Sequence, residues 1–420
     1  MRSVFANVTY RHLFTAQIVA LLGTGLLTIG LGLFAYDLAG SQGGQVLGIA
    51  MTVKMLAYVF VSPVMAALTA GLSRRSVLVA ADLVRAGVAV CLPFVTDVWQ
   101  IYVLVFVLQA ASATFTPTFQ SIIPDVLTQE REYTRALSLS RLAYNLESVI
   151  SPMLAALLLI VLSYSDLFIG TVAGFLLSAV LVISTRIPAR ALQHTTGFLD
   201  RLTLGTRLYV RIAQLRGLLA MYFAVACGTA MIIVNTAVLV GDRLGLSEQH
   251  VPLLLAASGV GEMVIALALP RFLDRHPDRG VMIAGAIFIP VLLLGSGAAL
   301  ATLEGSIAWV AVLILWFMLG TAISLVLTPS GRVIRRNVSD ADRPAVFAAD
   351  FSLSHACYIV TYLAAGIIGA SAGMAAASTT LGALALLGAA AAVLTWRRST
   401  PPGETSPAQT RNEATEGHTR

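Results

Sequence analysis

The stretch "GTGLLTIGLGLFAYD", Gly23 to Asp37, has a counterpart in "GTAMIIVNTAVLVGD", Gly228 to Asp242. The Gly-Thr pair and the final aspartate recur after a shift of 205 residues. The shift grows to 212 and then 214, where "SRLAY", from Ser140, matches "SHACY", from Ser354. An offset that grows slowly is what duplication followed by small insertions produces. The sequence therefore predicts two homologous halves.

The composition indicates an integral membrane protein. Of the 420 residues, 57% are hydrophobic and 11% charged, and the mean hydropathy is +0.85, far from the values of a soluble domain. A helix needs about 20 mainly apolar residues to cross a bilayer. The stretches that satisfy this requirement are 12–37, 45–69, 77–95, 99–123, 137–162, 166–185, 217–241, 251–271, 280–301, 306–330, 346–370 and 373–396.

We therefore predict an all-α membrane protein with twelve transmembrane helices in two parallel-repeat six-helix bundles, residues 1–190 and 217–398. A cytoplasmic linker, 191–216, joins them. Its segment "GFLDRLTLGTRLYVRIAQL" carries apolar residues on one helical face with arginines beside them, which predicts an interfacial helix. Residues 399–420 are polar and contain prolines, so we expect a disordered tail.

Arginines gather in every second connection between the predicted helices, including Arg2 and Arg11 before the first. By the positive-inside rule, both termini are expected to be cytoplasmic. The basic isoelectric point, about 9.5, then reports topology and does not indicate nucleic-acid binding. Lys54 is the only lysine, and the chain is rich in alanine and arginine, as bacterial proteins often are. We expect a multi-pass protein of a bacterial inner membrane.

Two loops at equivalent positions carry related motifs. "AALTAGLSRRSVL", 66–78, keeps an arginine pair, and "PRFLDRHPDRGVM", 270–282, keeps an Asp-Arg pair followed by a further arginine. With the twelve-span repeat, these loops resemble the major facilitator superfamily. The resemblance implies gating contacts at the residues Arg74, Arg75, Asp274, Arg275 and Arg279. Asp82 and Arg85, three residues apart on one helix, are a local substitute for an aspartate missing from the first loop.

The fifth predicted helix contains "SPMLAA", Ser151 to Ala156. It resembles the Gly-Pro-x-x-Gly-Gly signature of proton-coupled exporters in that superfamily, with Ser or Ala in place of Gly. Other segments resemble a bacterial exporter branch that includes multidrug-type and nickel-resistance carriers. The resemblance implies alternating access between two halves that rock about a central site.

Ionisable residues lie near the middle of four predicted helices: Lys54, Glu147, Glu262 and His355. Such groups cost several kcal/mol in hydrocarbon unless they face protein or water, and they commonly mark ion paths. The two glutamates are candidates for proton coupling or substrate contact, or for structural hydrogen bonds. Lys54 is a fixed counter-ion or a titrating group, and His355 is a switch or an interhelical hydrogen bond. For Asp350, nearer a helix end, gating and snorkelling are both open.

The resemblance places the substrate cavity on the first, fourth, seventh and tenth helices. Polar residues recur there at helical spacing, and they either recognise substrate or bind helices together. These candidates are Gln17, Thr24, Thr28, Gln109, Ser112, Thr116, Gln120, Thr229, Asn235, Trp316, Thr321, Ser324 and Thr328. Such an uncharged polar face suits a modest-sized organic molecule.

Enzyme motifs are absent from the sequence: it has no phosphate-binding loop, HExxH or Gly-x-Ser-x-Gly elbow. We expect a monomeric secondary transporter without cofactors or a resident metal, whose partners are protons, a small-molecule substrate and the bilayer. Proton-driven export of an organic compound is the first hypothesis. Divalent nickel or cobalt efflux is the second, and uptake or facilitated diffusion the third.

Overall fold

The computed structural model describes residues 2–61, 65, 72–127, 129–185, 187, 198–273, 276–339 and 342–396, apart from some side chains within the helices. In the first half the helices are α1 (Arg2–Ala6), α2 (Val8–Ala39), α3 (Gly43–Leu56), α5 (Arg74–Cys91), α6 (Val98–Val126), α7 (Glu130–Leu158) and α8 (Leu167–Ile183). Short turns between them are η1 (Gly40–Gln42), η2 (Ala57–Val61), η3 (Leu92–Phe94) and η4 (Tyr164–Asp166).

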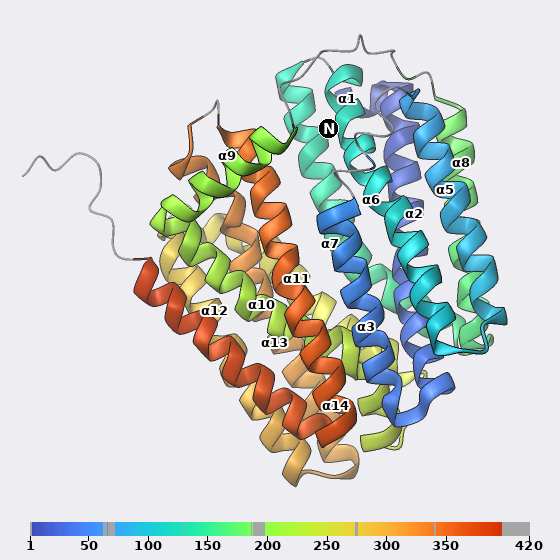
Figure 1. The fold of residues 1–420 in the computed structure, drawn as a ribbon, viewed down its shortest axis with the longest axis vertical. Coiled ribbons are helices and arrows are strands. Elements are labelled where there is room, and N and C mark those ends of the chain that lie inside the picture. The colour runs from blue at the N-terminus through green and yellow to red at the C-terminus, as the bar shows by residue number, and fades with distance from the viewer. Residues whose placement is uncertain are drawn as a thin grey trace, which may run out of the picture.

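A helix in the predicted linker, α9 (Phe198–Arg211), precedes the second half. That half contains α10 (Ala213–Val238), the turn η5 (Leu239–Arg243), α11 (His250–Leu273), α12 (Asp278–Thr302), α13 (Gly305–Asn337) and α14 (Arg343–Thr395). Most helices pack against others of their own half, whereas α3 packs extensively against α14 and α7 against α11, across the seam. Figure 1 shows the two bundles side by side, with α9 at one end of the second.

Within the described residues, nine helical segments are long and apolar enough to cross a membrane. Two of them, Val8–Val61 and Ala349–Thr395, each hold two of the predicted spans. In the second, the chain reverses at Gly373, whose φ of 85° lies in the left-handed region that favours glycine. α7 adds another span, although only Val149–Leu158 of it is strongly apolar. The helical membrane fold predicted from sequence is thus confirmed.

The helices form because a chain in hydrocarbon must satisfy its backbone hydrogen bonds within each segment. Their ends are set by polar caps. Asn7 accepts a hydrogen bond from the backbone N–H of Tyr10 at 3.1 Å at the start of α2, and Ser73 accepts one from Ser76 at the start of α5. The Asn7 amide also donates to the Val126 carbonyl at 3.1 Å, so α2 begins where α6 ends. The end of the molecule at which α2 begins and α6 ends is called the α9 end, and the opposite end is called the far end.

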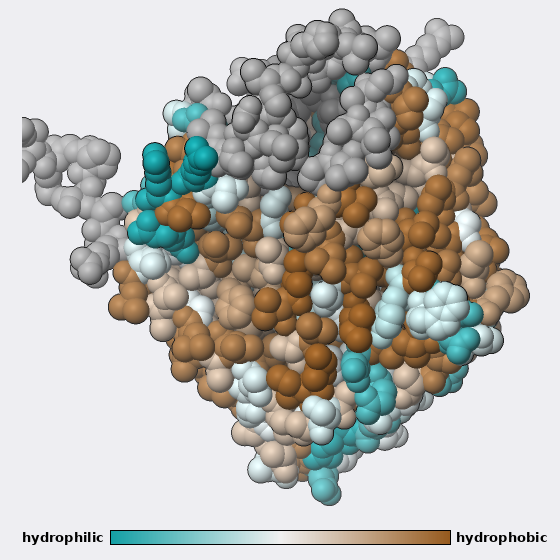
Figure 2. Space-filling model, viewed as in Figure 1, coloured by the Kyte–Doolittle hydropathy of each residue, from teal (hydrophilic) through white to brown (hydrophobic). Residues whose placement is uncertain are grey.

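The outer surface is apolar between these two ends. Large exposed side chains such as Ile169 and Leu394 lie on helices that a soluble protein would have to bury. In Figure 2 hydrophobic residues cover most of the visible face, and hydrophilic residues gather toward its ends. The surface is therefore suited to lipid.

The seam between the two halves is closest where α3 meets α14. A Cβ atom built on Gly48 would lie 2.6 Å from the Tyr362 carbonyl, and one built on Gly366 would lie 2.6 Å from the Gly44 carbonyl. Small residues allow helices to approach to backbone contact. This contact is in the part of the seam nearer the far end.

We predict that Gly366→Ala lowers the thermal unfolding midpoint of the purified protein in detergent. The added methyl group has no space between two backbones, and overpacking of this kind costs about 1–3 kcal/mol. Gly87→Ala is the matched control, because a Cβ there meets no atom within 4 Å. Equal midpoints for the two variants would contradict the close seam.

Candidate functional site

Four ionisable side chains meet at the middle of the seam. Lys54 on α3, Glu147 on α7, Glu262 on α11 and His355 on α14 are all half-buried. Lys54 interacts electrostatically with Glu147 and with His355, and Glu147 interacts with Glu262. The ion pairs found among the described residues do not include Lys54 with Glu147. The structure therefore brings the four candidates into one cluster and leaves them accessible surface.

Glu147 is positioned by close packing of α7 against α2. A Cβ on Gly25 would overlap the Ser151 side chain and lie 2.9 Å from Oε1 of Glu147. Ser151 begins the "SPMLAA" motif and is buried, and Pro152 lies inside the helix. The small residues of the motif thus serve to seat the carboxylate beside the first span.

Exposure of the interior rises toward the α9 end on both halves. On α6, Gln109 and Ser112 are buried, Thr116 is half-buried and Gln120 is exposed, although the four share one helical face. On α14, the exposed fraction rises from 6% at Tyr362 to 41% at Phe351.

The exposed surface of Phe351 faces the interior rather than lipid. Phe351 lies on the same helical face as Tyr362, which is eleven residues or about three turns further along α14. Exposed Val360 is nine residues or two and a half turns from Phe351, so it points to the opposite side of the helix. For the described residues, this gradient of exposure indicates that the interior opens toward the α9 end.

The far end is closed by contacts between the halves. Tyr36 on α2 donates a hydrogen bond to Asp242 at 2.6 Å, and its ring lies over Gly241, where a Cβ atom would overlap it. Gln249 donates to the Leu159 carbonyl at 3.1 Å. A cavity of about 230 Å³ lies beside these contacts, between Asp37 and Glu248. These contacts hold the two halves together at the far end.

Asp37 and Glu248 both line this far-end cavity. Asp37 accepts a hydrogen bond from Tyr164 at 2.5 Å. Glu248 lies in the loop before α11, where partial burial and the Asp37 carboxylate raise its pKa above the usual value. Its charged form therefore opposes folding at neutral pH.

We predict that Glu248→Gln raises the thermal midpoint near pH 7 and that the difference disappears near pH 4. A raised folded-state pKa makes the ionised group destabilising above that pKa, and below both pKa values the two proteins carry the same charge at this position. Melting curves across this pH range check the prediction. A difference that does not change with pH would contradict it.

The hydrogen bonds of the predicted wall residues stay within one helix in some cases and join two helices in others. Gln17 accepts a hydrogen bond from Ser140 at 3.0 Å, while Thr24, Thr28 and Ser112 donate to carbonyls one turn back on their own helices. Ser324 donates to the Glu262 carbonyl at 2.9 Å and pairs with Thr328, so it joins α13 to the helix of that acid.

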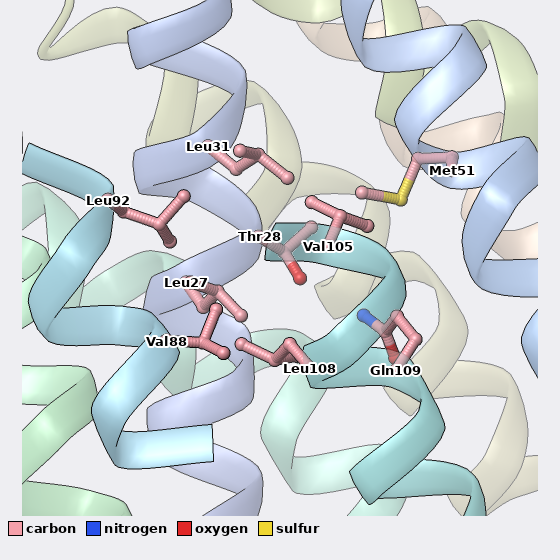
Figure 3. Close-up of a pocket in the computed structure, with 9 residues that line it drawn as sticks. All are labelled: Leu27, Thr28, Leu31, Met51, Val88, Leu92, Val105, Leu108 and Gln109. Atoms are coloured by element: carbon pink, nitrogen blue, oxygen red, sulfur yellow. The ribbon is translucent and has the colours of Figure 1, made fainter. Parts of the chain in front are cut away.

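Thr28 and Gln109 also border a small cavity inside the first half. Its volume is about 10 Å³, room for the centre of one water molecule. Figure 3 shows them as the two polar residues among its nine lining side chains. It is too small for an organic substrate.

Two wall predictions are wrong. Asn235 is fully buried between helices and donates to the Ala365 carbonyl at 3.2 Å, and Trp316 is fully buried and donates to Thr236 at 3.0 Å. Both contribute to packing in the second half, because their helix faces turn away from the cavity. Thr229 and Thr321 are half-buried, and Thr229 forms a hydrogen bond with Tyr358.

The gating candidates fall into different places. Arg74 pairs with Asp125 at 2.6 Å, joining the start of α5 to the end of α6. At the equivalent place in the second half, Asp278 at the start of α12 pairs with Arg336 at the end of α13, also at 2.6 Å. The basic residue starts the helix in the first half and the acidic residue starts it in the second, so the two charges are exchanged. Both pairs nevertheless join the start of one helix to the end of the next.

Arg75 donates to the Ile183 carbonyl, and Arg279 donates to the Trp396 carbonyl at 2.8 Å. Asp350 accepts a hydrogen bond from Tyr209 on α9 at 2.8 Å. It therefore links the linker helix to α14. Two further candidates, Asp274 and Arg275, lie outside the described residues.

Asp82 and Arg85 form the expected ion pair. Both are buried within α5, where Asp82 also accepts from Ser178 at 2.8 Å, and the guanidinium lies over the rings of Phe115 and Phe175. The pair thus lies in the core of the first bundle, on one helix as the sequence predicted. A charge there needs such partners because it is removed from water.

Sequence reasoning missed an aromatic stripe beside the ionisable cluster. Phe351, His355 and Tyr358 follow one another on α14, and Tyr58 on η2 lies against them, with its ring centroid 5.7 Å from that of His355. Tyr362 continues the stripe toward the far end. The signal was present in the spacing of 351, 355, 358 and 362, which puts these residues on one helical face.

Two bundles of membrane-crossing helices that enclose an ionisable, partly accessible centre define a membrane transporter. The model of the Major Facilitator Superfamily matches residues 13–289 and 218–417, and the chain belongs to this family. It is accordingly a secondary transporter of small molecules and not an enzyme.

Among curated proteins, macrolide efflux protein A of Streptococcus pyogenes is 24% identical over 187 residues, 43% of this chain and 45% of that protein. The protein of the same name from Enterococcus faecalis is 26% identical over 152 residues, 34% of this chain and 47% of that protein. The matches thus span less than half the length of these relatives. YfiS of Bacillus subtilis, an MFS-type transporter, is 23% identical over 79% of this chain and 80% of its own.

Solved structures share the fold at low sequence identity. The nucleoside transporter NupG superposes with a TM-score of 0.73 at 15% identity, covering 94% of this chain and all of its own. A bacterial homologue of the human lysosomal transporter Spinster, in an inward-facing and unoccupied conformation, gives 0.72 at 12%, covering 93% and 99%. These likenesses concern the fold alone. The described residues contain no group of three or more His, Cys, Asp or Glu side chains placed to hold a metal ion.

Proposed function

We propose that this protein is a proton-driven exporter that moves a small organic compound across a bacterial inner membrane by alternating access. The observation that carries the proposal is the cluster of Lys54, Glu147, Glu262 and His355 on four helices of the seam. Ionisable groups at this depth commonly mark proton or substrate paths. The relatives named for macrolide efflux support export of an organic cargo.

In the proposed cycle, substrate and proton compete for a buried carboxylate while the halves rock about it. Glu147 is half-buried, and its carboxylate lies against the first span beside Gly25. Binding of a proton removes the charge of a carboxylate that has little access to water, so that the protonated and ionised states favour different pairings with Lys54. Rocking then requires release of the Tyr36–Asp242 contact at the far end.

The orientation of the protein in the membrane is part of the proposal. We place the α9 end in the cytoplasm, because Arg74, Arg207 and Arg336 lie at that end. The interior then opens to the cytoplasm, where an exporter loads its cargo.

We predict that a single cysteine at position 207 reacts with a membrane-impermeant maleimide in everted vesicles and not in right-side-out vesicles. A cysteine at position 304 should show the reverse. Both side chains are exposed, and they lie on α9 and on the far-end loop before α13. The measurement uses a chain whose three native cysteines have been replaced. Reactivity of the two positions from the same side would contradict the proposed topology.

Proton coupling is tested in everted vesicles acidified inside by respiration and monitored with a pH-sensitive dye. Erythromycin, other lipophilic organic compounds, and Ni²⁺ or Co²⁺ are added in turn. We expect an organic compound to dissipate the proton gradient with wild type, and Glu147→Gln to reduce this response at least tenfold because its side chain cannot take up a proton.

Glu304→Gln is the control, since it removes an acid that is exposed in a loop outside the cluster. It should transport like wild type. A response only to the metal ions would instead favour metal efflux. The absence of any response from inserted wild-type protein would refute proton-driven export and favour uptake or facilitated diffusion.

A further inference from the structure

We propose that Tyr58, Phe351, His355 and Tyr358 form the wall that holds the cargo, and that the cargo is an organic monocation balanced by Glu262. This inference rests on the proposed function, because it names the chemical class carried at the same central site. It places recognition on α3 with η2 and on α14, and not on the first, fourth, seventh and tenth spans.

The four rings form one continuous surface across the seam. The His355 ring lies 4.1 Å from that of Phe351 and 6.2 Å from that of Tyr358, measured between centroids. From the other half, the Tyr58 ring lies 5.7 Å from His355 and 6.1 Å from Phe351. Both halves therefore contribute to the wall.

The wall is reachable from the open end of the interior. Tyr58, His355 and Tyr358 keep partial exposure, and the exposed part of Phe351 faces inward, as shown by its position opposite to Val360. Tyr58 lies on η2, a π-helical turn that follows Lys54 within a single span. Such turns re-aim side chains inside α-helices and are frequent at functional sites.

Negative charge faces this wall. Tyr58 interacts electrostatically with Arg85, whose charge is paired with Asp82, and with Glu147, and Tyr358 interacts with Glu262. Lys54 is near Glu147 and interacts with it, so one carboxylate of the pair already has a counter-ion. When Lys54, Glu147 and Glu262 are ionised and the His355 imidazole is neutral, these described side chains carry one uncompensated negative charge, on the Glu262 side.

Aromatic faces and a carboxylate together select an organic cation. The face of an aromatic ring attracts a cation within about 6 Å of its centroid, and the attraction grows when water is excluded. An anion would meet two carboxylates, and a neutral molecule would leave the charge of Glu262 without a partner. A dication would exceed the single available charge. A hydrophobic monocation satisfies both the rings and the charge.

The test measures binding to purified protein in detergent by equilibrium dialysis, with protein-free micelles as the blank. The probes are tetraphenylphosphonium and tetraphenylborate, which have nearly the same size and shape and opposite charge. We expect the cation to bind at least tenfold more tightly than the anion, a difference of about 1.4 kcal/mol. Glu262→Gln should weaken cation binding about tenfold.

The ring variants separate recognition from packing. Tyr58→Leu with His355→Leu should weaken cation binding about tenfold, whereas Tyr58→Phe, which keeps an aromatic face, should bind like wild type. Phe288→Leu is the matched control, because Phe288 is exposed on α12 away from the wall. Each variant is first checked for a single symmetric peak in size-exclusion chromatography.

Equal binding of the two ions, absence of cation binding, or full binding by the folded leucine variant would each overturn the inference. These measurements involve no proton gradient. Failure of proton-driven export in vesicles would therefore leave the binding result intact, and loss of charge preference would leave the vesicle result intact.

Discussion

An ionised group in the hydrocarbon core is stable only where protein or water surrounds it, and by biological insertion scales it otherwise costs about 2.5–3.5 kcal/mol. Lys54, Glu147, Glu262 and His355 lie on four different spans. Turning all of them inward fixes the rotation of each of these helices about its axis. The arrangement of the seam thus follows from where the chain places a few charges, and the apolar surface toward lipid is what remains on the opposite faces.

The two ends of the molecule are built differently around this centre. At the far end the halves contact each other through Tyr36 and Asp242 and through backbone approach at Gly48. At the α9 end, the strong ion pairs of Arg74 and Asp278 lie within each half. Ion pairs within one half stiffen that bundle without joining it to the other bundle. Rigid-body motion of one half against the other is therefore the conformational change with the lowest free-energy cost.

Sequence alone predicted the helical membrane fold, because apolar length survives in a one-dimensional pattern, and its rare charges pointed to the ionisable side chains that the structure brings together. It could not decide which polar faces meet water. Asn235 and Trp316 are residue types that often line cavities, yet neighbouring helices bury both of them completely. The aromatic stripe at Phe351 was missed for the converse reason: aromatic residues in an apolar helix look like packing until the other half is in place.

Tyr36 and Gly241 occupy equivalent positions in the two repeats, related by the same shift of 205 residues as Asp37 and Asp242. In the folded chain these two equivalent residues touch, so they lie next to the axis that relates the halves. A pair of identical large side chains cannot share that place, and a pair of glycines would leave it empty. The packing of the two halves at this axis is therefore asymmetric: the ring from one repeat fills the space that the glycine of the other leaves free.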